Sequence, residues 1–278
     1  KGGLTLGDVK AGGTFDATST DGVIEQAANT TIAVTGEATL GASQNGEAAD
    51  ITLDGANNDF GTVNTDGAAI TLVDANGLTL GTVAATGKLD VVGEDDVVLT
   101  GDVSAKTLDL SSTSGAINQT GGTLTVSDGP TNLDADDAIT LAQDNDFNGT
   151  VNVSGGTDVT LNDTDDITLG DVAATGKLDV VGEDDVVLTG DVSAKTLDLS
   201  STSGAINQTG GTLTVSDGPT NLGAGTDITL KSATNDFEGT VNADGKSIAL
   251  TDGKGGLTLG DVKAGGTFDA TSTDGVIE

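Results

Sequence analysis

The segment "KLDVVGEDDVVLTGDVSAKTLDLS" at residues 88–111 carries the pattern that decides the fold. Its two ends, KLDVV and TLDLS, alternate apolar and polar residues, and a short apolar stretch, VVL, lies between them. Such alternation is typical of a β-strand with one buried face. Gly and Asp separate the stretches, as they do at turns. We therefore expect short strands joined by tight turns, with no helix.

Exact internal repeats surround this segment. Residues 83–133 recur residue for residue as 172–222, at an offset of 89, and residues 1–25 recur as 254–278. Self-similarity of this kind is the signature of repeat architectures. The 253-residue period divides into sub-units of approximately 9–82, 83–171 and 172–261. Because residues 254–278 repeat the beginning, we expect the chain to be an internal window of a longer array.

A shorter period sets the architecture. The pattern x-apolar-x-apolar-x returns every 15–20 residues, which gives about 14 coils per 253-residue period. Stacked coils with two or three short strands each describe a parallel β-helix, and the handedness of parallel crossovers predicts a right-handed one. A sandwich or barrel also has short strands, but it does not require one template at near-constant spacing. We predict an all-β, right-handed parallel β-solenoid that runs continuously over residues 1–278 as one domain.

The composition excludes several kinds of function. The chain has no His, Cys or Arg, so it lacks nucleophile–base pairs of the Ser–His or Cys–His type and soft-metal sites. Its net charge of −34 argues against nucleic acid, which requires a basic surface. No apolar run is long enough to span a membrane. We expect no catalytic, cofactor-binding or resident metal site, no nucleic-acid partner and no membrane insertion.

Acidic clusters are the one candidate for chemistry. Two readings stay open for them: solvated acidic turns, or weak sites for Ca²⁺, which prefers several carboxylate and carbonyl oxygens. The clusters are Glu94, Asp95 and Asp96; Glu183, Asp184 and Asp185; Asp134, Asp136 and Asp137; and Asp163, Asp165 and Asp166.

The outward centres of the repeated strands form a predicted ladder. In it Asp90 lies over Asp109, and Asp179 lies over Asp198. Stacked like charges are destabilising, so one carboxyl is protonated, a neighbouring Lys88 or Lys177 screens the pair, or a cation bridges it. The full ladder reads Asp16, Ala33, Thr52, Thr71, Asp90, Asp109, Thr125, Thr140, Thr160, Asp179, Asp198, Thr214, Thr229, Ala249 and Asp269.

The five Phe residues fall into two groups. Phe15 and Phe268 are equivalent positions that we expect to point inward. Phe60, Phe147 and Phe237 share the motif Asn-Asp-Phe and mark the same corner of three units. We expect them to fill the core rather than to bind a ligand.

Several repeat phrases resemble a known family. "SGAINQTGGTLTVSDG" (114–129 and 203–218), "NDFxGTVN" and "LTLGDVxAxGxLDV" resemble the repeat region of large filamentous-haemagglutinin-like bacterial exoproteins. Those proteins leave the cell by two-partner or autotransporter secretion. The resemblance implies a secreted or surface-attached right-handed β-helical fibre.

These observations predict a function that is mechanical and not enzymatic. We expect a structural repeat segment of a secreted, acidic bacterial surface fibre, sheath or matrix filament, located outside the cell. The alternatives are the stalk of a cell-surface adhesin whose binding tip lies outside this sequence and, more remotely, a β-helical enzyme acting on polysaccharides. Expected partners are further copies of the chain, associating end to end or laterally, and the cell surface or a polysaccharide matrix.

Overall fold

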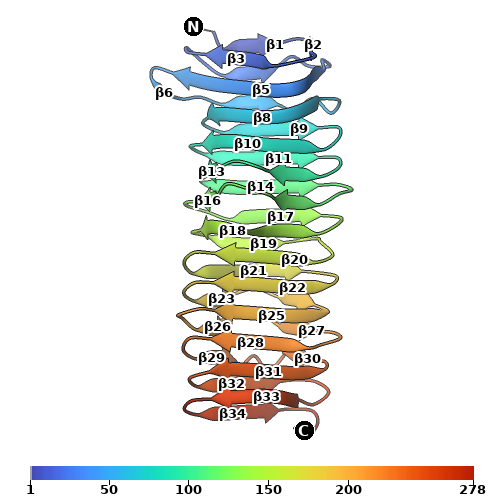
Figure 1. Cartoon of the computed structure of the whole chain (residues 1–278), viewed down its shortest axis with the longest axis vertical. Coiled ribbons are helices and arrows are strands. Elements are labelled where there is room, and N and C mark those ends of the chain that lie inside the picture. Colours follow the sequence, from blue (N-terminus) through green and yellow to red (C-terminus); the bar gives the residue numbers. More distant parts are fainter. Residues whose placement is uncertain (1) are drawn as a thin grey trace. The chain divides into compact units, whose positions relative to one another are not determined.

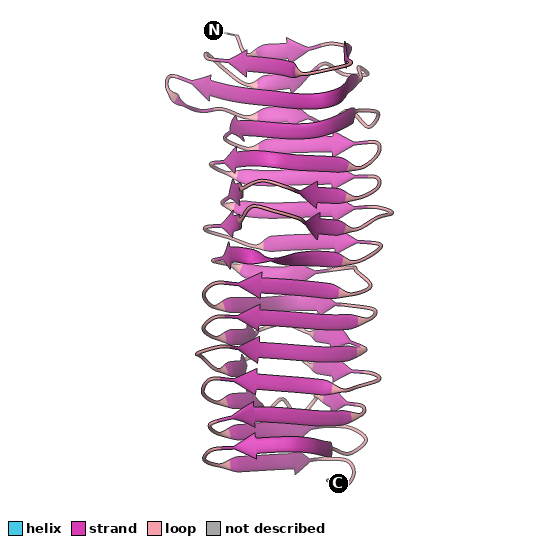
Figure 2. Ribbon diagram, in the orientation of Figure 1, coloured by secondary structure: helices cyan, strands magenta, loops and turns pink. Residues whose placement is uncertain are grey.

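The computed structural model describes residues 2–278 and contains only strands, turns and loops over that range (Figures 1 and 2). No helix among these residues could cross a membrane. Parallel strands form stacked coils, which confirms the predicted β-solenoid, with about 13 turns. The chain divides into two compact units, residues 1–138 and 139–278, which are described separately below.

The first unit consists of two parallel sheets, and the chain passes back and forth between them. The β1 sheet contains β1 (Leu4–Leu6), β4 (Ile24–Gln26), β7 (Ile51–Leu53), β9 (Ile70–Asp74), β11 (Lys88–Gly93), β14 (Thr107–Ser112) and β17 (Thr131–Ala135). The β2 sheet contains β2 (Val9–Ala11), β3 (Phe15–Ser19), β5 (Ile32–Gln44), β8 (Asp59–Gly67), β10 (Leu78–Ala85), β12 (Val97–Leu99), β13 (Val103–Ala105), β15 (Ile117–Gln119) and β16 (Leu124–Val126).

One hairpin interrupts this pattern. β5 continues beyond its neighbours and turns back into β6 (Glu47–Ala48), which pairs with it antiparallel (Figure 1). Asn45 and Gly46 at the tip both have positive φ, at 55° and 84°. An Asn-Gly pair with two positive φ angles is the preferred two-residue turn of a β-hairpin.

The second unit repeats the two-sheet plan. The β18 sheet contains β18 (Ile139–Phe147), β20 (Val159–Asp163), β22 (Lys177–Gly182), β25 (Thr196–Ser201), β28 (Thr220–Ala224), β31 (Thr240–Gly245) and β33 (Thr258–Ala264). The β19 sheet contains β19 (Thr150–Val153), β21 (Ile167–Ala173), β23 (Val186–Leu188), β24 (Val192–Ala194), β26 (Ile206–Gln208), β27 (Leu213–Val215), β29 (Ile228–Leu230), β30 (Asp236–Phe237), β32 (Ile248–Asp252) and β34 (Phe268–Ser272).

The core of each unit is a stack of aliphatic side chains. In the first unit Ile70, Leu89 and Leu108 lie in register in adjacent turns, and each is fully buried. Every second residue of these strands points inward, as the alternation predicts. Apolar burial at roughly 25 cal/mol per Å² favours each added turn, and no turn buries its inner face without a neighbour.

The predicted ladder is correct only in parts. Thr52, Thr71, Asp90 and Asp109 do stack in consecutive turns. So do Thr140, Thr160, Asp179 and Asp198, and a third run comprises Thr229, Ala249 and Asp269.

Other joins in that ladder are wrong. Asp109 pairs with Asn132, not Thr125, and Asp198 pairs with Asn221, not Thr214. The strands β17 and β28 were missed because buried Thr131 and Thr220 occupy inward positions where the template expects an aliphatic residue. Each of these two strands adds half a turn that the predicted ladder omits. From spacing alone, LTV at 124–126 is predicted to follow β14 in the β1 sheet, but it lies in the β2 sheet. Likewise, LTV at 213–215 is predicted to follow β25 in the β18 sheet, but it lies in the β19 sheet.

Further wrong joins lie near the start of the chain, where Asp16 pairs with Thr39 and not with Ala33. Ala33 pairs with Lys10, and Thr52 lies in the other sheet of the unit. The long strand β5 accommodates both β2 and β3 on one edge. The spacing of 17–19 residues between the predicted strands at Phe15, Ile32 and Ile51 does not reveal this arrangement.

The two identical copies of the 25-residue segment have different corners. In residues 1–25 the chain turns between β1 and β2, and β3 pairs with Ala38–Ala42. In residues 254–278 the equivalent of β1 and β2 is mostly one strand, β33, and β34 lies in the other sheet of its unit, whereas β2 and β3 share a sheet. One sequence thus places its corners differently according to which turn lies beside it.

Candidate functional site

The stacked carboxylates on the first unit are bridged by a lysine. The ammonium of Lys88 lies 3.0 Å from Oδ2 of Asp90 and 2.5 Å from Oδ2 of Asp109. Asn132, one turn further along, donates a 2.6 Å hydrogen bond to the other oxygen of Asp109. Of the three explanations considered for this stack, the structure supports screening by lysine.

The second unit contains the same arrangement. Lys177 lies 2.8 Å from Asp179 and 2.5 Å from Asp198, and Asn221 donates to Asp198. Asn242 then donates a 2.8 Å hydrogen bond to the side-chain oxygen of Asn221. Lysine, carboxylate and amide side chains therefore form a connected outward row over four consecutive strands, β22, β25, β28 and β31.

The charges in these bridges shift one another's pKa values. The hydrogen bonds that Lys88 donates to Asp109 and Asp90 raise the pKa of Lys88 above its ordinary value. Burial opposes ionisation of Asp109, but the hydrogen bonds from Lys88 and Asn132 outweigh it and lower the pKa of this carboxyl. Bonds to Asp179 and Asp198 likewise raise the pKa of Lys177. The bridge is thus stable in its ionised form.

Many Asp and Asn side chains accept a backbone hydrogen bond from the next turn. Oδ1 of Asp102 accepts a 2.9 Å hydrogen bond from the backbone N–H of Thr123, and Asp191 accepts one of 2.8 Å from Thr212. In every such pair the donor lies 18–23 residues after the acceptor. We call these side chains the inter-turn caps: Asp8, Asp50, Asn64, Asp96, Asp102, Asn152, Asp158, Asp166, Asp171, Asp185, Asp191, Asp227 and Asn242.

A second set of acidic residues is buried. Asp74 is only 2% exposed, and its carboxylate accepts hydrogen bonds from the backbone N–H groups of Phe60 (2.6 Å) and Asn76 (2.8 Å). Asp163 binds the N–H groups of Phe147 and Asp165 in the same way, at 2.8 Å each. Asp252 occupies the third equivalent position and accepts from Phe237 at 3.2 Å. These three positions lie 89 residues apart.

Burial shifts the pKa of two of these carboxyls. Desolvation is the largest influence on Asp74 and Asp163, and it raises the pKa of both above the usual 3.8 despite the two backbone hydrogen bonds. Of the two readings left open for the cluster of Asp163, Asp165 and Asp166, a solvated turn is wrong for Asp163, since only 2% of this residue is exposed. The pattern that could have identified it is its offset of 89 from Asp74.

The Asn of the Asn-Asp-Phe motif is buried at the corner that also contains the motif's Phe. Asn58 is fully buried and exchanges two side-chain hydrogen bonds with Gln26, of 2.7 and 2.8 Å. Its oxygen also accepts from the backbone N–H of Ile32. Asn235 and Gln208 form the equivalent amide pair, with the N–H of Leu213 as the third partner.

The three Phe side chains of the motif lie in the core, as predicted. Phe60, Phe147 and Phe237 are each 1–2% exposed. Phe268 pairs with the buried Ile248 and so lies at an inward position, as predicted, although 43% of it is exposed.

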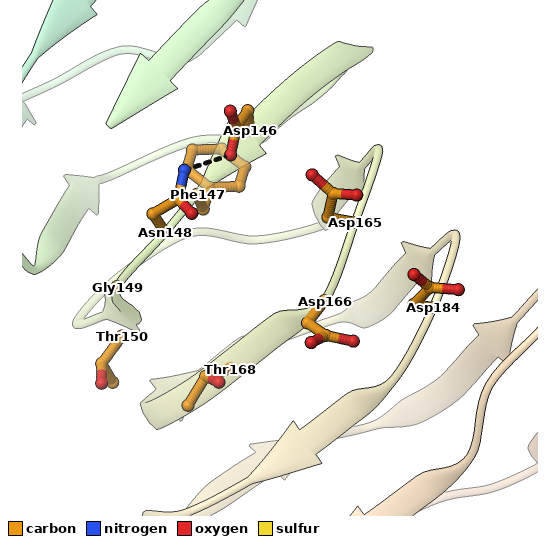
Figure 3. Close-up of a pocket in the computed structure, with 9 residues that line it drawn as sticks. All are labelled: Asp146, Phe147, Asn148, Gly149, Thr150, Asp165, Asp166, Thr168 and Asp184. Atoms are coloured by element: carbon orange, nitrogen blue, oxygen red, sulfur yellow. Dashed lines mark hydrogen bonds between the residues drawn. The ribbon is translucent and has the colours of Figure 1, made fainter. Parts of the chain in front are cut away.

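A depression on the second unit brings acidic clusters together (Figure 3). It measures about 540 Å³ and places Asp165 and Asp166 near Asp184 and Asp146. Asn148 donates a 2.5 Å hydrogen bond to Asp146. The four carboxylates are spread along the depression and do not converge on one point.

The depression does not form a metal-binding cluster. Within residues 2–278, no three acidic side chains are close enough together to hold a metal ion. Its other lining residues are Phe147, Asn148, Gly149, Thr150 and Thr168, so it offers no cationic group to an anionic ligand. The remaining clustered acids, Glu94, Asp95, Asp134, Asp136, Asp137 and Glu183, are exposed.

One family model matches this chain over most of its length. It describes repeats of unknown function (DUF5649), and it matches residues 1–66, 93–154 and 181–244. The chain belongs to this repeat family. No curated protein and no solved structure matches it.

The repeat-family matches agree with the corner described above. Each matched segment ends six or seven residues after the Phe of an Asn-Asp-Phe motif, at Phe60, Phe147 and Phe237. The family repeat therefore carries one buried Asn–Phe corner per copy. The resemblance to haemagglutinin-like exoproteins rests on the quoted phrases and is taken up below.

Proposed function

We propose that this chain is a structural repeat segment of a secreted, acidic bacterial filament, sheath or matrix fibre. One observation carries the proposal: aspartate side chains all along the chain join one turn to the next. The inter-turn caps and the lysine bridges hold the solenoid together. Such use of carboxylates favours a mechanical role over ligand binding.

The surface suits an extracellular polymer. A net charge of −34 keeps such a chain solvated and limits non-specific lateral packing, which salt would relieve. Tandem identity between residues 83–133 and 172–222 duplicates every surface group within them. Duplicated modules serve a structural array well, whereas an active site needs only one copy.

The resemblance to filamentous-haemagglutinin-like exoproteins supports secretion and the surface location. It also supports an adhesin stalk, in which the same solenoid presents a distal binding domain. The filament is preferred because the lysine bridges and the inter-turn caps recur in both units.

The test is to label the chain in the cells that produce it. Immunogold electron microscopy with antibodies to residues 2–278 should decorate ordered extracellular polymers at regular intervals. Isolated cell-anchored threads would favour the adhesin stalk, and label confined to the cell interior would overturn both. Release of reducing ends from acidic or neutral polysaccharides by the purified chain would instead support the enzyme.

A further inference from the structure

Three corners of the solenoid share one plan and differ at one position. Each has a buried aspartate that accepts the backbone N–H of a Phe: Asp74, Asp163 and Asp252. The residue two positions later donates its own N–H to the same carboxylate, at 2.8 Å in the first two corners and 3.5 Å in the third. This residue is Asn76 in the first corner, Asp165 in the second and Lys254 in the third. Equivalent places therefore hold a neutral, an acidic and a basic side chain.

The third corner holds an ammonium group that the chain itself supplies. The Nζ atom of Lys254 lies 2.7 Å from Oδ2 of Asp236, whose side chain is only 12% exposed. The hydrogen bond to Asp236 raises the pKa of Lys254, and nearby negative charges raise it further. Those charges belong to Asp236, Glu238 and Asp252. The acidic groups of this corner are thus arranged around a cation.

The second corner has acidic groups without that ammonium. Asp146 is the equivalent of Asp236, because each precedes the Phe of an Asn-Asp-Phe motif. Asp165 stands where the third corner has its lysine. Desolvation is the largest influence that raises the pKa of the buried Asp163, and the charges of Asp146 and Asp165 raise it further. Like charges therefore face one another here, and a cation would relieve their repulsion.

The acidic depression of the second unit lies at this corner and has the size of a small-molecule site (Figure 3). It measures about 540 Å³, and its acidic residues are the half-buried Asp146 and the exposed Asp165, Asp166 and Asp184. The N–H of Asp184 donates a 3.1 Å hydrogen bond to the backbone oxygen of Asp165, so adjacent turns supply these two side chains. A row of separated carboxylates does not suit one metal ion, which needs several oxygens around one point. It suits several ammonium groups joined by flexible methylenes.

These carboxylates can accept further hydrogen bonds. Oδ1 of Asp146 accepts from Asn148, and Oδ1 of Asp184 accepts from the hydroxyl of Ser203. Oδ1 of Asp166 accepts from a backbone N–H of the next turn. The second oxygen of each carboxylate can therefore accept from an ammonium group, which donates three hydrogen bonds.

We propose that the second corner binds a linear alkyl polyamine. One ammonium group donates to Asp146, as that of Lys254 donates to Asp236 in the third corner. The methylene chain extends along the depression, and a second ammonium group lies between the carboxylates of Asp165 and Asp184. Hydrogen bonds between ammonium and carboxylate are charge-assisted and about twice as strong as neutral ones. The inference goes beyond the proposed function, because it assigns a small-molecule ligand to one corner of the chain.

The negative charge of the whole chain also attracts cations, so the test must separate a site from that attraction. Spermidine is titrated into the full, isotope-labelled chain in about 0.15 M salt, where the Debye length is about 8 Å. The backbone amide NMR signals of residues 146–150 and 165–168 should shift and saturate. Those of the exposed acidic turn of Asp134, Asp136 and Asp137 should stay in place.

Two variants with the same change of charge test the role of Asp165. Asp165→Lys gives the second corner the residue type of the third, so the new ammonium group should fill the depression and weaken spermidine binding about tenfold or more. Asp217→Lys alters an exposed aspartate of the same unit outside the depression and should leave the affinity within about twofold. Circular dichroism checks that both variants keep the β-solenoid.

Other cations test the class of ligand. Propylamine carries one ammonium group and should bind about tenfold or more weakly than spermidine, because it reaches only part of the row of carboxylates. Mg²⁺ should also bind more weakly, since no three acidic side chains among residues 2–278 converge on one ion. Equal affinity of spermidine for Asp165→Lys and Asp217→Lys would overturn the inference. So would NMR shifts spread evenly over the acidic turns, equal affinity for propylamine, or tighter binding of Mg²⁺.

Discussion

The ammonium of Lys88 lies 2.5 Å from a carboxylate oxygen of Asp109, which belongs to the next turn of the solenoid. The same relationship joins Lys177 to Asp198. Because each lysine also contacts the aspartate of its own strand, it neutralises a pair of like charges that stacking forces together.

Replacing this lysine should therefore expose the repulsion. We expect Lys88→Gln to lower the free energy of unfolding by about 1 kcal/mol or less, since the three side chains are 35–45% exposed and solvent screens them. Urea denaturation at low salt measures the loss, and added salt should reduce it. Lys106→Gln is the control, because Lys106 lies 3.9 Å from a single aspartate, Asp128; an equal loss in both variants would contradict the bridge.

The bridge also predicts a pH dependence. The lowered pKa of Asp109 means that its contribution is present above the unfolded value, near 3.8, and is lost as the pH falls through the lower folded value. The raised pKa of Lys88 means that its contribution is present below 10.5 and is lost as the pH rises through the higher folded value. The difference in stability between wild type and Lys88→Gln should thus be constant from about pH 5 to 9 and shrink in strong acid. A difference that is largest below pH 3 would refute this assignment.

The buried carboxyl of Asp74 predicts the opposite sign. Its raised pKa means that the proton favours the folded state, so its contribution is greatest below 3.8 and is lost as the pH rises through the folded value. Asp74→Asn should cost less than Asp74→Ala, because its amide oxygen keeps one of the two acceptors. Asp74→Ala should cost about 2–3 kcal/mol, because alanine leaves the N–H groups of both Phe60 and Asn76 without their acceptor.

Carbon-detected NMR titration of Asp74 and urea denaturation at pH 4 and pH 7 measure these effects. The gap between wild type and Asp74→Asn should change with pH, while Asp54→Asn, at an exposed aspartate, serves as control. A titration midpoint below 3.8 for Asp74 would contradict the role of desolvation.

The glycine pair at the corner of the "SGAINQTGGTLTV" segment predicts a steric effect. Gly211 has φ of 64°, and a Cβ there would collide with the carbonyl of Gly190 in the preceding turn. We expect Gly211→Ala to cost more than about 2 kcal/mol, from the left-handed conformation and the collision together. Gly223→Ala is a matched control, because a Cβ at Gly223 has its nearest neighbour at 4.0 Å. Thermal denaturation compares the two; equal melting temperatures would show that the turns can separate.

The buried amide pair gives the largest predicted effect on a single side chain. Asn235→Ala removes three hydrogen bonds at once, those with Gln208 and with the N–H of Leu213. A loss of about 3 kcal/mol is expected, since buried polar partners are left unsatisfied. Asn148→Ala removes an exposed amide and should change stability by less than about 0.5 kcal/mol. Similar losses in the two variants, measured by urea denaturation, would remove Asn235 from its structural role.

Sequence by itself determined the fold class. Alternation in strands such as KLDVV and the 89-residue identity require short strands in stacked turns, because an inner face of this kind is buried only against its neighbours. It also placed Asp90 over Asp109 and brought three Phe residues to one kind of corner, since both follow from spacing alone.

Only the tertiary structure decided which strands pair, which polar residues are buried and where the corners lie. A buried Thr131 looks polar in the sequence, so β17 and its half-turn were missed and the ladder changed sheet there. The buried role of Asp74 depends on the N–H of Phe60, 14 residues earlier, which no local pattern predicts. The corners of "KGGLTLGDVKAGGTFDATSTDGVIE" differ between its two copies, since β2 and β3 share one sheet whereas β33 and β34 lie in different sheets. Because the residues are identical, the packing of the neighbouring turns decides where these corners lie.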